Sequence, residues 1–135
     1  MEKVKGIVFP VPHKFIAPIF SGKKDVFIKL RVGRFKLLKA KQKIIFYDSG
    51  IHKLVGQAKI LSIHIDKPNI IWEMYGNRIF LEKKDFEKYI KISPLGHFRN
   101  LERSKLTAIV YSNPHKYSKP KESHRRMTIA GFYLR

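Results

Sequence analysis

The stretch that decides the fold is Phe20-Ser21-Gly22-Lys23-Lys24-Asp25-Val26-Phe27-Ile28-Lys29-Leu30-Arg31. It opens with turn residues and continues with strict alternation. One parity holds Val26, Ile28, Leu30 and Val32, and the other holds Phe27, Lys29 and Arg31. Because alternation with a period of two is typical of a half-buried strand, we predict a β-strand over 24–32. One of its faces should meet a core, and the other should present cations beside an aromatic ring.

Two further strands are predicted downstream of this stretch. Residues 43–47 are apolar on both parities, as expected of a strand that is buried on both faces. After a turn at 48–50, a long strand is predicted over 53–65, and its apolar parity switches between Ile60 and Leu61. A slip of one residue indicates a β-bulge, which is a device that lets a strand turn the corner of a barrel.

The rest of the chain predicts short elements around these strands. Helix 67–75 should start with Asp66 as its N-cap and bury Ile70, Ile71, Met74 and Tyr75. Residues 113–126, rich in Lys, Ser, Pro and His, should form a mobile basic loop. The other predicted elements are strands over 4–11, 105–112 and 127–134, and helices over 13–20 and 83–91. Together they predict an α+β fold, a mixed β-barrel of about five to six strands with about three short helices, in a single domain over 1–135.

Charge is the most unusual property of the composition. The chain has 135 residues, with 29 basic and 10 acidic side chains, for a net charge of +19. A field of this size attracts polyanions, so nucleic acid is the first partner to consider. A membrane is disfavoured because no apolar run approaches about 18 residues. With no cysteine, the chain has no disulfide framework or thiolate metal site, and without a visible signal peptide we expect a cytoplasmic location.

Several motifs resemble those of a known family. Gly22, Lys24 and Lys29 resemble the Gly-x-Lys-x-x-x-x-Arg signature of ASCH domains in the PUA-like superfamily, with Lys29 standing where the signature has Arg. The strand ending Tyr47-Asp48-Ser49, the following Leu54-Val55-Gly56-Gln57-Ala58 and the closing Ala130-Gly131-Phe132-Tyr133-Leu134 are similar to archaeal PUA-like proteins. The resemblance implies a small β-barrel domain of a superfamily that mostly handles RNA.

One branch of ASCH domains also implies an enzymatic alternative, an amidohydrolase acting on acylated cytidine. In that branch the motif Lys is the base and a Thr three residues later is the nucleophile. Lys24 is present here, but Phe27 occupies the nucleophile position and has no hydroxyl. The remaining enzymatic reading is a hydrolase of a modified nucleoside in which Lys24 acts with water. The six histidines are scattered singly, so we predict no metal site and no cofactor.

A binding function requires fewer specific residues than catalysis does. Lysine and arginine neutralise phosphates, and an exposed ring stacks on an unpaired base. We expect RNA as the partner. Duplex DNA is the weaker candidate, because a barrel offers no helix or ribbon obviously shaped for the major groove. A third reading is a subunit of a larger ribonucleoprotein complex, and the oligomeric state stays open. The predicted phosphate-binding residues are Lys24, Lys29, Arg31, Arg34, Lys36, Arg99, Arg103, Arg125 and Arg126. The predicted walls of a pocket for a base, whether ordinary or modified, are Phe27, Tyr47, Ser49 and Trp72.

Overall fold

The computed structural model describes residues 4–29, 38–91, 105–128 and 131–134. Within these residues the chain forms six strands, three α-helices and two 3₁₀ helices. In chain order the elements are β1 (Gly6–Val11), η1 (His13–Phe15), α1 (Ile16–Ile19), β2 (Val26–Lys29), β3 (Lys43–Asp48), β4 (Lys53–Asp66), α2 (Pro68–Tyr75), η3 (Gly76–Arg78), α3 (Lys83–Lys91), β5 (Leu106–Lys121) and β6 (Phe132–Leu134). The predicted α+β class is confirmed.

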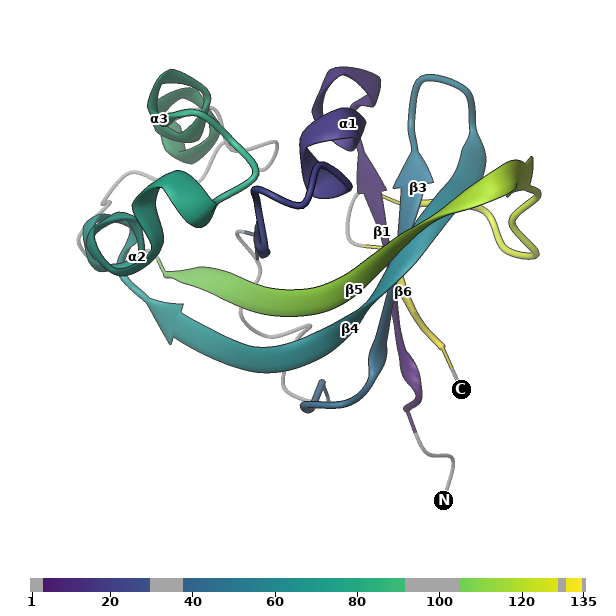
Figure 1. The fold of residues 1–135 in the computed structure, drawn as a ribbon, viewed down its shortest axis with the longest axis horizontal. Coiled ribbons are helices and arrows are strands. Elements are labelled where there is room, and N and C mark those ends of the chain that lie inside the picture. Colours follow the sequence, from purple (N-terminus) through teal and green to yellow (C-terminus); the bar gives the residue numbers. More distant parts are fainter. Residues whose placement is uncertain (1–3, 30–37, 92–104, 129–130, 135) are drawn as a thin grey trace.

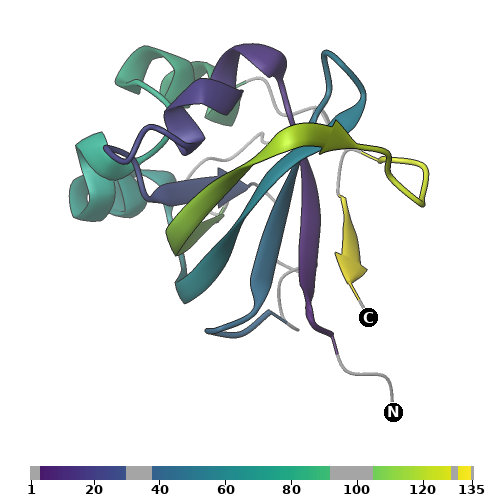
Figure 2. The same ribbon diagram turned by 45° about the vertical axis from the view of Figure 1, so that its right-hand side comes forward.

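The six strands form one sheet in the order β2-β5-β4-β3-β1-β6. β1 and β3 are parallel, and the other neighbouring pairs are antiparallel. The long strands β4 and β5 curve across the molecule, and all three helices lie on the concave side of the sheet (Figure 1). The turned view shows the same one-sided arrangement, with β6 at the far edge (Figure 2). The predicted barrel is therefore a curled half-barrel whose hollow side is filled by the helices.

A buried tyrosine ties the helical layer to the sheet. Tyr111 of β5 is almost fully buried, and its single hydroxyl proton is shared between Ile19 O (2.9 Å) and Lys24 O (3.2 Å). Burial raises the pKa of this phenol, so it remains a donor at neutral pH. The bonds fix the end of α1 and the approach to β2.

None of the helices in the described part of the chain has the length and apolar character needed to cross a membrane.

The predicted one-sided burial of β2 is wrong. Val26, Phe27 and Ile28 are all buried, and Phe27 is only 2% exposed. The ring of Phe27 contacts Phe9 of β1 and Phe46 of β3, two strands that do not pair with β2, and it stacks on Phe80, which follows η3. The alternation fails to predict this because Phe27 joins a cluster of rings supplied by distant parts of the chain, Phe9, Phe46 and Phe80. The segment after η3 also pairs along the edge of β2, where Val26 bridges Ile79 and the Phe80 N–H donates to Val26 O.

The predicted bulge in the long strand is confirmed. The register of β4 against β5 shifts between Ile60 and Ser62, where the apolar parity switches. Ile60 is fully buried, whereas Leu61 is 50% exposed. The switch therefore marks the bend correctly, but Leu61 does not join the core.

The predicted end of the next strand at Asn113-Pro114 is wrong, because β5 continues to Lys121. Gln57 pairs with His115, and Lys59 pairs with Ser112. Two residues of β5, Asn113 and Pro114, therefore lie opposite one residue of β4, Ala58, which makes a bulge. Asn113 has a φ of 51°. A bulge tolerates a proline because no ladder hydrogen bond is required there. The first part of the predicted basic loop is thus strand.

Helix α2 begins and packs differently from the prediction. The cap position is Lys67 rather than Asp66, although the Asp66 carboxylate accepts the backbone N–H of Lys67 at 2.8 Å. Ile71 is buried as predicted, but Met74 is 51% exposed. Trp72 packs on Phe86 of α3, with ring centroids 4.9 Å apart. Because α3 packs on Trp72, the face of α2 that meets the rest of the protein includes Trp72 rather than Met74.

Candidate functional site

A cavity of about 420 Å³ opens on the concave side between the sheet and α3. Its walls come from the end of β1, from η1, from β2, from the link after η3 and from α3. The lining is mainly apolar and includes four aromatic side chains. We call it the aromatic pocket and define it by Phe15, Phe27, Phe80 and Tyr89.

The inner wall of the aromatic pocket is rigid. Phe27 and Phe80 stack with ring centroids 4.9 Å apart and an interplanar angle of 26°. Phe15 meets Phe80 edge to face at 6.1 Å. Phe27 and Phe80 are buried, whereas Phe15 and Tyr89 are partly exposed. The partly exposed rings are therefore the ones that a ligand can reach.

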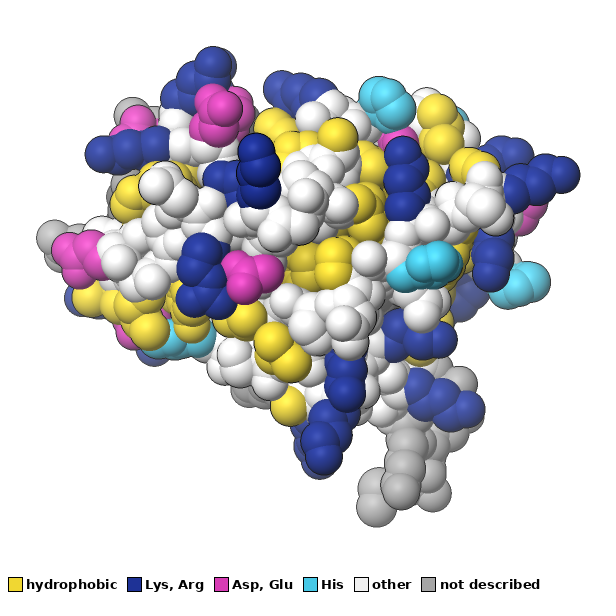
Figure 3. All heavy atoms as spheres, in the orientation of Figure 1, with side chains coloured by type: hydrophobic (Ala, Val, Ile, Leu, Met, Phe, Trp, Pro, Cys, Tyr) yellow, Lys and Arg dark blue, Asp and Glu magenta, His cyan; other side chains and the backbone are white. Residues whose placement is uncertain are grey.

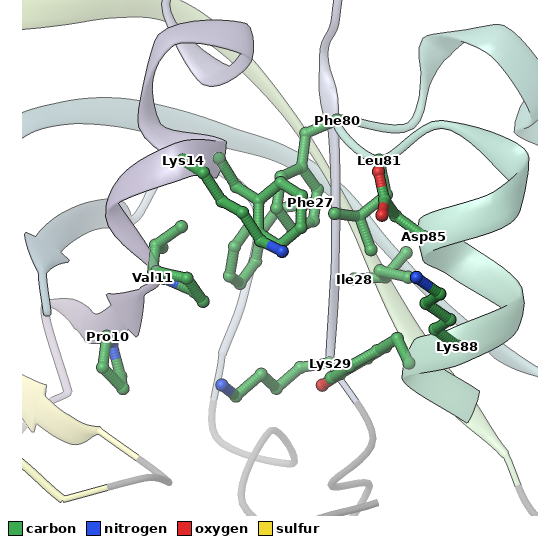
Figure 4. A pocket seen from close by; sticks show the side chains of 13 residues that line it. Pro10, Val11, Lys14, Phe27, Ile28, Lys29, Phe80, Leu81, Asp85 and Lys88 are labelled. Carbon is green, nitrogen blue, oxygen red and sulfur yellow. The ribbon is translucent and has the colours of Figure 1, made fainter. Parts of the chain in front are cut away.

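Three lysines from three different elements surround the aromatic pocket. Lys14 comes from η1, Lys29 from the end of β2 and Lys88 from α3, with Asp85 as the acidic group in the lining (Figure 4). The ammonium of Lys14 lies 4.9 Å from the centroid of the Phe15 ring, and that of Lys29 lies 5.6 Å from the centroid of Phe9. The described residues thus give the rim a net positive charge over an apolar interior.

A buried carboxylate holds the wall that carries Lys14 and Phe15. Asp48 is 2% exposed and accepts hydrogen bonds from His13 Nδ1 (2.6 Å) and from the backbone N–H of Gly50 (2.8 Å) and Ile51 (3.4 Å). Burial raises the pKa of Asp48, but the bonds from His13 and these two backbone groups outweigh it and lower the pKa below its ordinary value. The β3–β4 turn is therefore tied to the start of η1.

The opposite wall is held by the turn that precedes β2. The Arg78 guanidinium donates two hydrogen bonds to the Asp25 carboxylate, at 2.9 and 3.0 Å. Lys24 Nζ donates to Asn77 O at 2.5 Å. These contacts fix η3 beside β2 and so place Phe80 and Leu81, which follow η3, in the lining of the aromatic pocket.

The predicted base-pocket residues do not come together in one cavity. Phe27 lines the aromatic pocket from within the core. Tyr47 and Ser49 lie at the β3–β4 turn outside its lining: the Tyr47 hydroxyl is 3.4 Å from His52 Nδ1, and the Ser49 N–H donates to Val11 O. Trp72 also lies outside the lining, on Phe86.

The predicted phosphate-binding residues are similarly divided. Lys29 belongs to the rim of the aromatic pocket, whereas Lys24 lies outside its lining, bonded to Asn77. Arg125 and Arg126 are exposed after β5, and the Arg125 guanidinium stacks over Phe132 at 4.8 Å. The other five predictions fall outside the described residues: Arg31, Arg34, Lys36, Arg99 and Arg103.

Charge is spread over the visible face of the molecule rather than gathered in one patch. Lysine and arginine side chains stand around exposed apolar surface, and most of the acidic side chains lie on the half of the face that carries α2 and α3 (Figure 3). This agrees with the nearly balanced composition of residues 66–91, which hold six basic and five acidic side chains. That segment nonetheless supplies Lys88 and Tyr89 to the aromatic pocket.

Sequence reasoning missed most of the aromatic pocket. The sequence places Lys14 and Phe15 in the predicted helix over 13–20 and Tyr89 in the predicted helix over 83–91, without a signal that they share a cavity. The run Ile79-Phe80-Leu81 is a signal of chain returning to the core, but it does not predict that Phe80 lines a cavity. Lys88 carries no local signal, because exposed lysines are abundant along this chain.

The fold is that of ASCH domains. The crystal structure of ASCH from Zymomonas mobilis aligns with a TM-score of 0.76 over 97% of this chain and 88% of that chain, at 22% identity. Protein EF3133 from Enterococcus faecalis V583 aligns with a TM-score of 0.66 over 93% of this chain and 89% of that chain, at 14% identity. At these identities the likeness establishes the fold alone, and it confirms the resemblance drawn from the motifs.

The chain belongs to the family described as a domain of unknown function, DUF365, whose model matches residues 4–135. A relative in Methanocaldococcus jannaschii, "Uncharacterized protein MJECS03", is 30% identical over 96 residues, which cover 69% of this chain and 89% of the relative. Family membership thus rests on sequence, whereas the likeness to ASCH domains rests on the fold.

Proposed function

We propose that this protein is an RNA-binding domain that takes one unpaired base into the aromatic pocket and holds the flanking phosphates on the lysine rim. The observation that carries the proposal is the combination of an apolar cavity of about 420 Å³ with lysines from three elements around it. A cavity of this size lies within the usual range of small-ligand sites, about 300–1,000 Å³. It is large enough for a nucleobase.

The chemistry of the aromatic pocket suits a base better than a charged head group. Phe15 and Tyr89 offer partly exposed rings, and stacking of a base on an aromatic ring contributes about 1–3 kcal/mol. Asp85 offers an acceptor for an amino or ring N–H group of the base. The mostly apolar lining also accommodates a methyl or acyl substituent, so a modified base is compatible with it.

The partner is inferred to be single-stranded because the site is concave. A base inside a duplex is not accessible to such a pocket unless it is flipped out of the stack, which costs a few kcal/mol. The net charge of +19 contributes the sequence-independent part of the affinity. Hydrolysis with Lys24 as base is less well supported, since Lys24 lies outside the lining and is bonded to Asn77 O.

Phe15→Leu tests the proposal, because leucine keeps apolar volume but removes the ring. We expect it to weaken binding of a single-stranded RNA by about 1–3 kcal/mol at every salt concentration, the contribution of one stacked base. The measurement is a salt titration of affinity for single-stranded RNA and for duplex DNA of equal length. Wild type should prefer the RNA.

The matched control is Tyr75→Leu, which removes a partly exposed ring outside the aromatic pocket. Its affinity for RNA should equal that of wild type. Equal binding of both polymers, together with equal behaviour of Phe15→Leu and Tyr75→Leu, would mean that the positive charge attracts polyanions without a base-binding site.

A further inference from the structure

A second depression lies on the side of the sheet that faces away from the helices. It measures about 200 Å³, and we call it the outer hollow, defined by Lys41, Lys43, Gln57, Lys59 and Asn113. Lys43 and Lys59 are exposed, whereas their strand neighbours Ile44, Ala58 and Ile60 are buried. Because successive side chains of a strand point to opposite faces, both lysines stand on the outer face. Among the described residues, none lines both the outer hollow and the aromatic pocket.

The charges in the outer hollow are unbalanced. Lys43 and Lys59 are directly opposite each other in the β3–β4 ladder. Like charges in this position repel and destabilise a sheet. Among the described residues no carboxylate lines the outer hollow, and none of the ion pairs found between them involves Lys41, Lys43 or Lys59. A bound anion would remove this repulsion.

The Gln57 side chain in the outer hollow is oriented by a hydrogen bond from Tyr117. The Tyr117 hydroxyl donates to Gln57 Oε1 at 2.9 Å, so the amide nitrogen of Gln57 remains as the donor. Burial raises the pKa of the Tyr117 phenol, which keeps its proton at neutral pH. The ring is held between His115, at 6.1 Å between centroids, and the Lys121 ammonium, at 4.4 Å from the centroid. Three lysines and the Gln57 amide thus line the outer hollow, and no carboxylate is among its described lining residues.

We infer that the outer hollow binds a backbone phosphate of the nucleic acid, as a contact separate from the aromatic pocket. The choice of nucleic acid as partner rests on the proposed function. A shallow, solvated group of lysines binds one free anion weakly, because exposed ion pairs contribute little. A polymer that is already held at another site presents its phosphates at high effective concentration, so the same lysines then add measurable affinity.

The test compares Lys43→Ala/Lys59→Ala with Lys67→Ala/Lys84→Ala, a control that removes the same charge from exposed positions outside both sites. Loss of one phosphate contact on a single strand should lower the slope of log affinity against log salt by about 0.7 and the affinity at 0.1 M salt about fivefold. The control should keep the wild-type slope. The melting temperature of the first variant should equal or exceed that of wild type, because a repulsion is removed.

The inference is overturned if both double variants keep the wild-type slope. It is also overturned if inorganic phosphate alone saturates the outer hollow at micromolar concentration, as followed by the amide resonances of 41–43 and 57–59, while RNA leaves these resonances unmoved. The site would then be one for a small anion. Phe15→Leu is measured alongside, because it tests the aromatic pocket and not the outer hollow. If Phe15→Leu weakens RNA binding and Lys43→Ala/Lys59→Ala does not, only the phosphate contact in the outer hollow is rejected. If wild type shows no RNA binding, both are rejected.

Discussion

Replacement of Lys14, Lys29 and Lys88 together by alanine is expected to weaken binding of single-stranded RNA by about 100-fold at 0.1 M salt. Each phosphate contact on a single strand contributes about 0.7 to the slope of log affinity against log salt. Between 1 M and 0.1 M salt this amounts to about fivefold per contact, and three contacts multiply. The three lysines surround the aromatic pocket from η1, β2 and α3 (Figure 4), so the expected loss in slope is about 2.

The control for this prediction is a variant that carries alanine at Lys23, Lys67 and Lys84, which are exposed and lie outside the lining of both sites. It has the same net charge as the first variant. Affinities are measured by fluorescence anisotropy at several salt concentrations. If the two triple variants lose affinity equally, the rim has no special role and only net charge matters.

The second large effect is on stability, since Phe27→Ala is expected to lower the free energy of unfolding by about 3–5 kcal/mol. Phe27 is 2% exposed and packs on Phe9, Phe46 and Phe80. Its truncation leaves a void between the sheet and the segment after η3. Because small domains have only about 5–15 kcal/mol of total stability, a loss of this size raises the unfolded fraction of the protein. Chemical denaturation monitored by circular dichroism measures the change.

Phe27→Leu keeps most of the buried volume and should remain folded with a smaller loss. Its RNA affinity should stay within about threefold of wild type, because the rings that a base reaches are Phe15 and Tyr89. A Phe27→Ala protein of unchanged stability, or a Phe27→Leu protein that is folded but no longer binds RNA, would contradict the core assignment. Phe27 would then be the base-stacking wall that the alternation of its strand predicts.

Much of the fold can be predicted from local sequence. Strands over 4–11, 43–47 and 53–65 are predicted because their apolar residues have the right period, and the bulge after Ile60 shows as a parity switch. The extension of β5 beyond Asn113 is not predictable in this way, because polar composition and a proline indicate a loop. It is the pairing with Gln57 and Gly56 of the bent β4 that makes these residues a strand.

The candidate site is harder to predict, because it is assembled by long-range packing. Lys29 was found through its place in a strand and a family motif, whereas Lys14 and Lys88 come from other elements. Trp72 was singled out as an available ring, but α3 covers it through Phe86. Alternation within one strand indicates which residues share a face, but it does not indicate which helix will cover that face.

The most direct test of the central claim is to map the RNA contact on the wild-type protein by NMR. A short single-stranded RNA is titrated into isotope-labelled protein, and amide and aromatic resonances are followed. The account predicts the largest shifts at Phe15, Lys29 and Tyr89, with intermolecular contacts between RNA base protons and the rings of Phe15 and Tyr89. Shifts confined to lysines scattered over the surface, with the resonances of Phe15 and Tyr89 unchanged, would contradict it.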